Sequence, residues 1–195
     1  DFRSYLLKAK ATNPDALVCS GLVDETVRCL VQSYEVGIPK SVARVANSVA
    51  SKVEVPTNAG KAAVGVSYAA AFAASDTRPI AKKFVKHIKS RYGVVPGHDF
   101  SQMEDLLTML KPALEKAEKQ FSGDLASDRK AVRDSIAGIT NFTGLASGPI
   151  SFCAAGSPEC RDGNRTPVMI EYTKGGKNWK TKVAGTVTFN ASAGL

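Results

Sequence analysis

The first 45 residues alternate between helical and extended hydrophobic patterns, and this alternation restricts the fold more than any other feature of the sequence. Apolar residues at helical spacing predict helices over 5–11 and 24–34, and short apolar runs predict strands over 16–19 and 41–45. Strands that alternate with helices are typical of a parallel sheet covered by helices. The sequence therefore predicts an α/β fold.

The middle and final thirds of the chain have different patterns. The expected elements there are a strand over 63–70, helices over 78–92, 100–119 and 127–137, and strands over 148–152, 167–173 and 179–188. Pro112 is expected to kink the second of these helices or to divide it, and Ser127 is a candidate N-cap of the third. The residues Lys174-Gly175-Gly176-Lys177 have hairpin-turn chemistry. We expect a three-layer lobe with an added carboxyl-terminal hairpin.

A formal net charge of +8 would suit a nucleic-acid partner if the charge were concentrated. The charge is dispersed, and its densest cluster, between Lys82 and Arg91, has helical spacing and is interleaved with apolar residues. No row of aromatic residues accompanies this cluster. We therefore interpret it as a solvated helix face and expect no nucleic-acid partner.

The four cysteines give a weak indication of an oxidising compartment. Cys153 and Cys160 flank a turn-rich segment and are predicted to form a disulfide. For Cys19 and Cys29, a bridge and two buried thiols both remain open. No apolar run reaches the roughly 18 residues of a membrane span. No secretory signal precedes Asp1, so either a signal has been removed or the chain begins within a longer protein.

Motifs for catalysis are missing from the sequence. It has no Gly-x-Ser-x-Gly elbow, no glycine-rich phosphate loop and no His-Glu-x-x-His pair. His87 and His98 are not placed to complete a zinc site with the cysteines. We expect no enzymatic activity, no cofactor and no metal.

Several segments, taken in order, resemble the type I periplasmic solute-binding proteins, especially the branched-chain amino-acid group. The resemblance rests on Asp1-Phe2 to Asp15-Ala16-Leu17, Gly21, Gly37-Ile38-Pro39, Pro79-Ile80-Ala81-Lys82-Lys83-Phe84 to Arg91-Tyr92-Gly93, Asp105-Leu106-Leu107 to Ala117, Ala131-Val132-Arg133-Asp134 to Phe142-Thr143-Gly144, and Gly148-Pro149-Ile150-Ser151-Phe152. These segments cover nearly the entire chain.

The resemblance implies two lobes, one of them incomplete in this chain. Residues 1–60 and 148–195 would belong to the carboxyl-terminal lobe, and 61–147 would complete the amino-terminal lobe, whose first half is missing. We expect apolar faces of the middle helices to need a cover, supplied by a missing amino-terminal half or by a second chain. The resemblance also implies a periplasmic or extracellular location, with an anchor through an absent N-terminal segment as a further option.

The resemblance places a ligand in a cleft between the lobes, held by loops at strand ends. The positions that match the family's aromatic and acidic contacts to an amino acid hold Leu22 and Ala46, which argues against an α-amino-acid ligand. Arg44 could bind a carboxylate, or it could be an exposed charge at the end of a strand. Asn47 could supply an amide contact or simply form a turn. Phe100 could stack on the ligand or pack in the core.

The function implied by the resemblance is capture of a small organic acid or amino-acid-like solute for an ABC permease. One alternative is a ligand-sensing domain of a receptor or regulator, because this fold serves there too. A second alternative, of another class, is a small enzyme with an unrecognised site. The identity of the ligand and the oligomeric state are left open.

Overall fold

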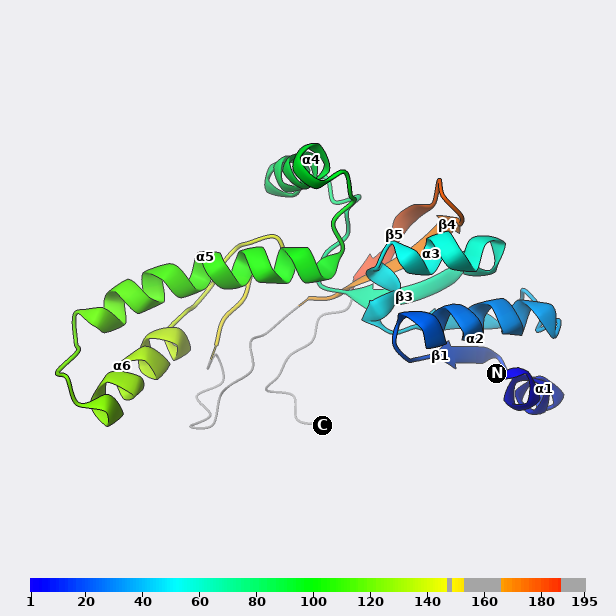
Figure 1. Ribbon diagram of the computed structural model, residues 1–195, viewed down its shortest axis with the longest axis horizontal. Coiled ribbons are helices and arrows are strands. Elements are labelled where there is room, and N and C mark those ends of the chain that lie inside the picture. The colour runs from blue at the N-terminus through cyan, green and yellow to red at the C-terminus, as the bar shows by residue number, and fades with distance from the viewer. Residues whose placement is uncertain (147–148, 153–165, 187–195) are drawn as a thin grey trace.

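The computed structural model describes residues 1–146, 149–152 and 166–186 (Figure 1). Its helices are α1 (Arg3–Ala11), α2 (Val23–Glu35), α3 (Glu54–Ala59), α4 (Pro79–Tyr92), α5 (His98–Glu118) and α6 (Leu125–Ala137), and two 3₁₀ turns cover Ser48–Ser51 and Gly60–Ala63. Its strands are β1 (Ala16–Cys19), β2 (Ala43–Ala46), β3 (Val66–Ala70), β4 (Val168–Lys174) and β5 (Lys180–Thr186). The mixed α/β fold predicted from the sequence is confirmed.

The five strands form one sheet in the order β1-β2-β3-β4-β5. β1, β2 and β3 are parallel, and the β4–β5 hairpin continues the sheet in antiparallel pairing. β3 lies in the residue range 61–147, and it is the central strand of this sheet, paired with β2 and β4.

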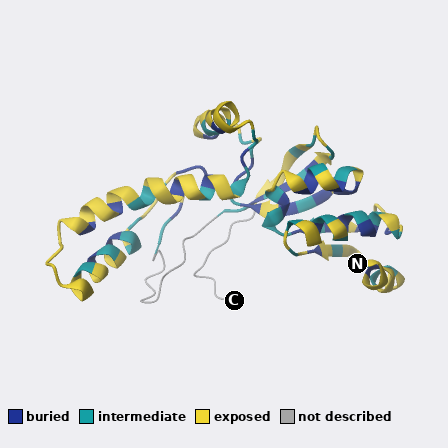
Figure 2. Ribbon diagram, viewed as in Figure 1, coloured by how far each residue is buried: buried dark blue, intermediate teal, exposed yellow. Residues whose placement is uncertain are grey.

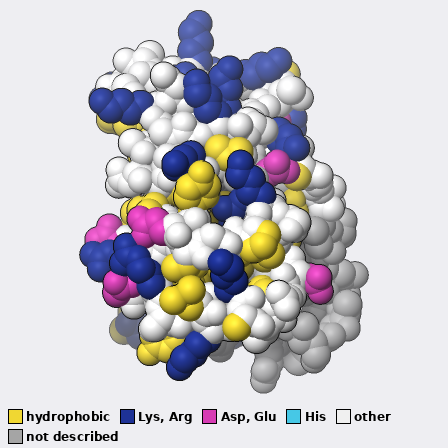
Figure 3. Space-filling model, turned by 90° about the vertical axis from the view of Figure 1, so that its right-hand side faces the viewer, with side chains coloured by type: hydrophobic (Ala, Val, Ile, Leu, Met, Phe, Trp, Pro, Cys, Tyr) yellow, Lys and Arg dark blue, Asp and Glu magenta, His cyan; other side chains and the backbone are white. Residues whose placement is uncertain are grey.

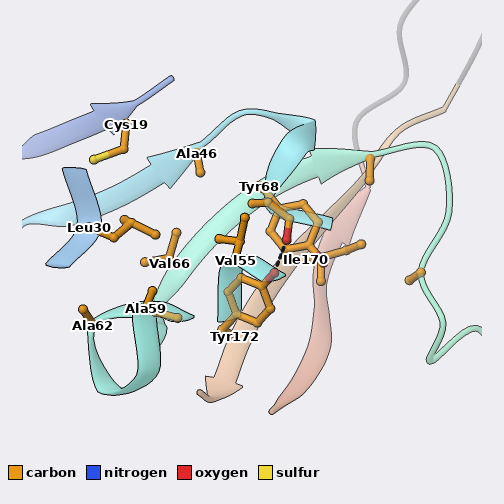
Figure 4. Close-up of a cluster of buried hydrophobic side chains, with 14 of the residues drawn as sticks. Cys19, Leu30, Ala46, Val55, Ala59, Ala62, Val66, Tyr68, Ile170 and Tyr172 are labelled. Atoms are coloured by element: carbon orange, nitrogen blue, oxygen red, sulfur yellow. Dashed lines mark hydrogen bonds between the residues drawn. The ribbon is translucent and has the colours of Figure 1, made fainter. Parts of the chain in front are cut away.

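The main core lies between the sheet and the helices α2 and α3 (Figure 4). Tyr68 and Tyr172 stand at its centre with ring centroids 5.3 Å apart, and the Tyr172 hydroxyl donates a hydrogen bond to the Ala50 carbonyl. Burial raises the pKa of Tyr68 to about 12. Strand residues alternate between faces, so Val18 lies on the face opposite to Cys19, and it is 66% exposed.

α1 packs beside β1 and α2, whereas α4 and most of α5 and α6 lie away from this sheet (Figure 1). α4 packs on a small cluster around Phe72, Ala81 and Leu145, and α5 and α6 pack against each other as an extended pair. Most of their surface is exposed (Figure 2). The chain thus has a sheet-based lobe and a separate set of helices, joined by the segment from β3 to α4 and by the segment from α6 to β4.

Local details differ from the sequence predictions at helix ends and in the middle of α5. α6 begins at Leu125, and its N-cap is Asp124, whose Oδ2 accepts a hydrogen bond 2.9 Å long from the Ser127 amide; the prediction of Ser127 as N-cap is wrong. α5 continues past Pro112 without division. In place of the strand expected over 148–152, residues 149–152 contain isolated bridge positions: Ile150 pairs with Phe142, and the Phe152 amide donates to the Ile139 carbonyl.

Candidate functional site

The carboxyl ends of β1, β2 and β3 meet at one edge of the sheet, because these strands are parallel. In open α/β sheets, ligands bind outside this edge. The residues that follow β1 and β2 form the first two loops at this carboxyl edge. The Asn47 Nδ2 group donates a 2.9 Å hydrogen bond to the Gly21 carbonyl and so joins the two loops. The sequence predicted both loops at this position.

A disulfide holds the first of these loops. Cys19, the last residue of β1, is bonded to Cys29 in α2, which resolves the pair that the sequence left open. The bridge closes the segment that contains Gly21 and Leu22, so the loop has little freedom to move away from the sheet. The predicted Cys153–Cys160 bridge lies outside the described residues.

The first turn of α5 packs against the segment that follows β2. Gly97 stands so close to Ser51 that an added Cβ would lie 2.9 Å from the Ser51 carbonyl oxygen. The Asp99 carboxylate lies between Lys52 and His98, with Lys52 Nζ 2.5 Å from Oδ2 and His98 Nε2 2.9 Å from Oδ1. These contacts bring the start of α5 to the same edge of the sheet.

Burial lowers the pKa of His98 below its usual 6.5, and Lys52 acts in the same direction. Asp99 opposes both effects without reversing them. The imidazole is therefore more often neutral than an exposed histidine would be at the same pH, and its contact with Asp99 is a hydrogen bond rather than a full ion pair in that state.

The sequence-predicted site residues do not all face this edge. Leu22, at the N-cap of α2, is 74% exposed, and Phe100, in the first turn of α5, is 46% exposed. The side chain of Ala46 is buried in the main core. Asn47 lies at the edge, and its Oδ1 atom has no hydrogen-bond partner among the described residues.

Arg44 has a different environment from the one expected of an anion contact. It is 6% exposed, and its Nη2 lies 3.5 Å from the carbonyl oxygen of Val64, which precedes β3. The guanidinium is therefore directed toward the amino-terminal end of β3 and away from the carboxyl edge. In this conformation Arg44 does not offer the carboxylate contact predicted from the sequence, because burial within the lobe has fixed the direction of its side chain.

A buried carboxylate joins α5 to the connection that returns from α6 to the sheet. Asp105 is 3% exposed, and its two oxygens accept hydrogen bonds of 2.6 and 2.7 Å from the amides of Leu145 and Ala146. Gly144 leaves no room for a side chain, because an added Cβ would overlap the Asp105 carboxylate.

The same connection is held on its carbonyl side by Arg78, which lies just before α4. Its guanidinium donates to the carbonyls of Leu145 at 2.6 Å and Gly144 at 3.2 Å, while Asp76 Oδ2 lies 2.7 Å from Nη2. Arg78 thus joins the segment before α4 to residues 144–146, and Asp105 joins α5 to the same residues. We call residues 144–146 with Asp105 and Arg78 the clamp.

The sequence predictions did not identify Lys52, Asp99, Arg78 or Asp105. Each of them acts through a partner distant in sequence, up to 68 residues away for Arg78, and no local spacing reports such a contact. Within the described residues, no group of His, Cys, Asp and Glu is arranged to hold a metal ion. In the same ranges, no helix is both long enough and apolar enough to cross a membrane.

Solved structures from several bacteria are similar to this chain. A leucine-binding protein from Thermotoga maritima MSB8 is 25% identical, with a TM-score of 0.75 over 96% of this chain and 49% of that one. A solute-binding protein of an ABC transporter from Rhodopseudomonas palustris BisB5, in complex with 3,4-dihydroxybenzoic acid, is 21% identical. Its TM-score is 0.74, and the match covers 100% of this chain and 51% of that one.

Another R. palustris solute-binding protein, in complex with benzoate, is 18% identical. Its TM-score is 0.71, and the match covers 98% of this chain and 49% of that one. This chain therefore spans about half the length of the structures it matches. No curated protein sequence matches it. The family model described as periplasmic binding protein matches residues 1–161, which is most of the chain. The chain belongs to the periplasmic binding protein family.

Proposed function

We propose that this chain supplies one wall of a solute-binding site in an extracytoplasmic binding protein that serves an ABC permease. The observation that carries the proposal is the open edge where three parallel strands end beside the first turn of α5, in a chain of this family. Binding requires no covalent chemistry, so we propose no enzymatic activity.

The proposed contacts at this wall come from Leu22, Asn47 and Phe100. Leu22 and Phe100 offer exposed apolar surface, and Asn47 Oδ1 is an acceptor without a partner among the described residues. Ala46 contributes the end of β2 through its backbone. A wall of this kind suits the hydrocarbon or aromatic part of a ligand together with one hydrogen-bond donor.

The proposed ligand is a small organic acid or an amino-acid-like solute. Similar proteins are described as binding leucine, benzoate and 3,4-dihydroxybenzoic acid, and each of these compounds carries a carboxylate. Because the Arg44 guanidinium is directed away from the edge, we propose that the ligand carboxylate is held by groups other than Arg44. Arg44→Ala should then lower stability without changing selectivity among carboxylates.

The second wall is proposed to come from another lobe that covers α5. Leu106, Leu107 and Leu114 are 47%, 59% and 41% exposed, and leucines with this exposure on one helix are typical of a surface that binds a partner. The similar structures are about twice as long as this chain. The lobe can be a further part of the same protein or a second chain.

The disulfide supports the proposed location. Disulfides persist in oxidising compartments such as the periplasm and the cell exterior, and Cys19 is bonded to Cys29. A permease is the proposed partner on the membrane. A neighbouring permease gene would support the transport role over a sensor domain.

Calorimetric titration with leucine, benzoate and 3,4-dihydroxybenzoate as probes tests the proposal. We expect weak or absent binding to the 195-residue chain alone, and binding once a second lobe is present, because half of the contacts and the burial on closure are otherwise missing. Leu22→Asp should weaken that binding by roughly tenfold or more, since it places a desolvated charge against the ligand.

The control is Leu7→Asp on α1, another exposed leucine, which lies beside Pro14 and Val42 at the amino-terminal ends of β1 and β2. Equal loss of affinity in both variants would argue against the proposed wall. Tight stoichiometric binding by the isolated chain would contradict the need for a second lobe. Turnover of a probe that is lost in His98→Gln would replace the binding role with an enzymatic one.

A further inference from the structure

One face of α4 is entirely cationic. Lys82, Lys86 and Lys89 follow one another at spacings of four and three residues and so form one row along the helix. Lys83 lies beside this row. α4 contains no Asp or Glu, so the row has no acidic neighbour on its own helix.

The lysine row is exposed and lies about a third of a turn around α4 from its buried side. That buried side is formed by Ala81 and Ile88, and Ala81 packs in the cluster around Phe72 and Leu145. All four lysines are exposed. Within the described ranges, none of them forms an ion pair.

The cationic surface extends beyond α4. In Figure 1 the upper end of the molecule is formed by α4 and by the β4–β5 hairpin, whose turn carries Lys177. Figure 3 shows that Lys and Arg side chains gather at this upper end, with few acidic side chains among them. Lys82, Lys86 and Lys89 also line a shallow groove with Ala74, Val85 and Ser90.

We propose that this lysine face docks on an anionic phospholipid surface. Unpaired like charges repel one another, so a plane of anionic headgroups would lower the energy of the row, and the groove could receive one headgroup phosphate. The inference goes beyond the proposed function and does not depend on which solute is bound.

The composition of the face favours a membrane over other anionic partners. Protein–protein interfaces are enriched in arginine and depleted of lysine, whereas polybasic lysine segments bind anionic membrane surfaces. Recognition of single-stranded nucleic acid uses aromatic side chains for stacking, and the lysine row contains none.

Co-sedimentation with lipid vesicles tests this proposal on the 195-residue chain. The protein should bind vesicles that contain phosphatidylglycerol in phosphatidylcholine and should not bind pure phosphatidylcholine. Each lysine near such a surface contributes about a fivefold change in partitioning, so the triple variant Lys82→Gln, Lys86→Gln and Lys89→Gln should bind on the order of 100-fold more weakly. Added salt should release the wild-type protein.

The control removes the same charge from the far end of the helix pair, with Lys116→Gln, Lys119→Gln and Arg129→Gln. These side chains are exposed and lie at the end of α5 and the start of α6. Binding close to wild type in this variant supports the proposal. Equal losses in both triple variants, no binding to anionic vesicles, or binding to a short DNA duplex in preference to vesicles would each overturn it.

Discussion

The clamp predicts a large and localised effect of removing one carboxylate oxygen from Asp105. Both oxygens accept short hydrogen bonds from buried amides. In Asp105→Asn one acceptor becomes an NH₂ group that faces an N–H donor. A hydrogen bond to a charged group contributes about 1.5–3 kcal/mol, so we expect Asp105→Asn to lower the free energy of unfolding by about 2–3 kcal/mol and Asp105→Ala by about 3–5 kcal/mol.

Urea unfolding of the 195-residue chain measures the total loss, and amide hydrogen exchange locates it. The amides of Leu145 and Ala146 should exchange much faster in Asp105→Asn, and amides of α2 should change only by the global loss of stability. Glu104→Gln is the matched control, because it removes the same charge from the adjacent, exposed residue and should stay within about 0.5 kcal/mol of wild type.

Two results would refute this reasoning. Asp105→Asn could prove no more destabilising than Glu104→Gln. It could also destabilise the chain while the exchange of Leu145 and Ala146 stays unchanged relative to the rest of the lobe. The first result would remove the energetic role of the clamp, and the second would show that the loss arises elsewhere.

Three further perturbations have defined outcomes. Replacing Cys19 and Cys29 by serine should lower the free energy of unfolding by about 2.7 kcal/mol, because the disulfide no longer restricts the unfolded chain. Urea unfolding measures this loss, and wild-type protein treated with a reductant should show the same loss. The folded-state pKa of His98 is lowered, so its contribution to stability is present above pH 6.5 and is lost as the pH falls below that value; urea midpoints of His98→Gln should depend less on pH in this window. Leu107→Gln should change the stability of the isolated chain by less than about 0.5 kcal/mol, whereas Ala117→Gln, at a buried position of α5, should cost about 1–3 kcal/mol by overpacking, both measured by urea unfolding.

Much of the sheet-based lobe could be predicted because local periodicity determines it. The strands and helices before Val45 each bury one side against a neighbour in the same lobe, so their hydrophobic patterns are complete within the sequence. The segment over residues 48–63 was not predicted as helical, because Pro56 and Gly60 are typical of loops. Pro56 lies in the first turn of α3, where its missing N–H has no intrahelical partner to lose.

At the candidate site, the resemblance placed the loops that hold Leu22 and Asn47 at strand ends, and the structure has both loops at the carboxyl ends of parallel strands. The directions of the side chains there could not be predicted in the same way. The direction of Arg44 depends on its neighbour Val64 across the sheet, and the role of Asp105 depends on amides some 40 residues away. Contacts at such sequence separation leave no periodic signal.

α5 buries small residues and leaves most of its leucines exposed, in line with the expectation that the apolar faces of the middle helices need a cover. Its buried residues are the small or clamp-forming Ser101, Asp105, Ala113 and Ala117. These residues recur every four positions or a multiple of four, and their size lets α6 and the clamp approach closely. The leucine pattern therefore indicates a surface that the described part of the chain leaves uncovered.

The exposed leucines link stability to binding. Full burial of a leucine side chain contributes about 1.5–3 kcal/mol, and Leu106, Leu107 and Leu114 each retain about half of their exposure. Covering all three would therefore contribute roughly 2–5 kcal/mol, a large fraction of the 5–15 kcal/mol by which an ordinary domain is stable. A lobe seated on this face would also supply the second wall of the proposed cleft. Because such a lobe would bind the folded helices and not the unfolded chain, it would raise the stability of the helix pair by mass action and would assemble the proposed site in the same step.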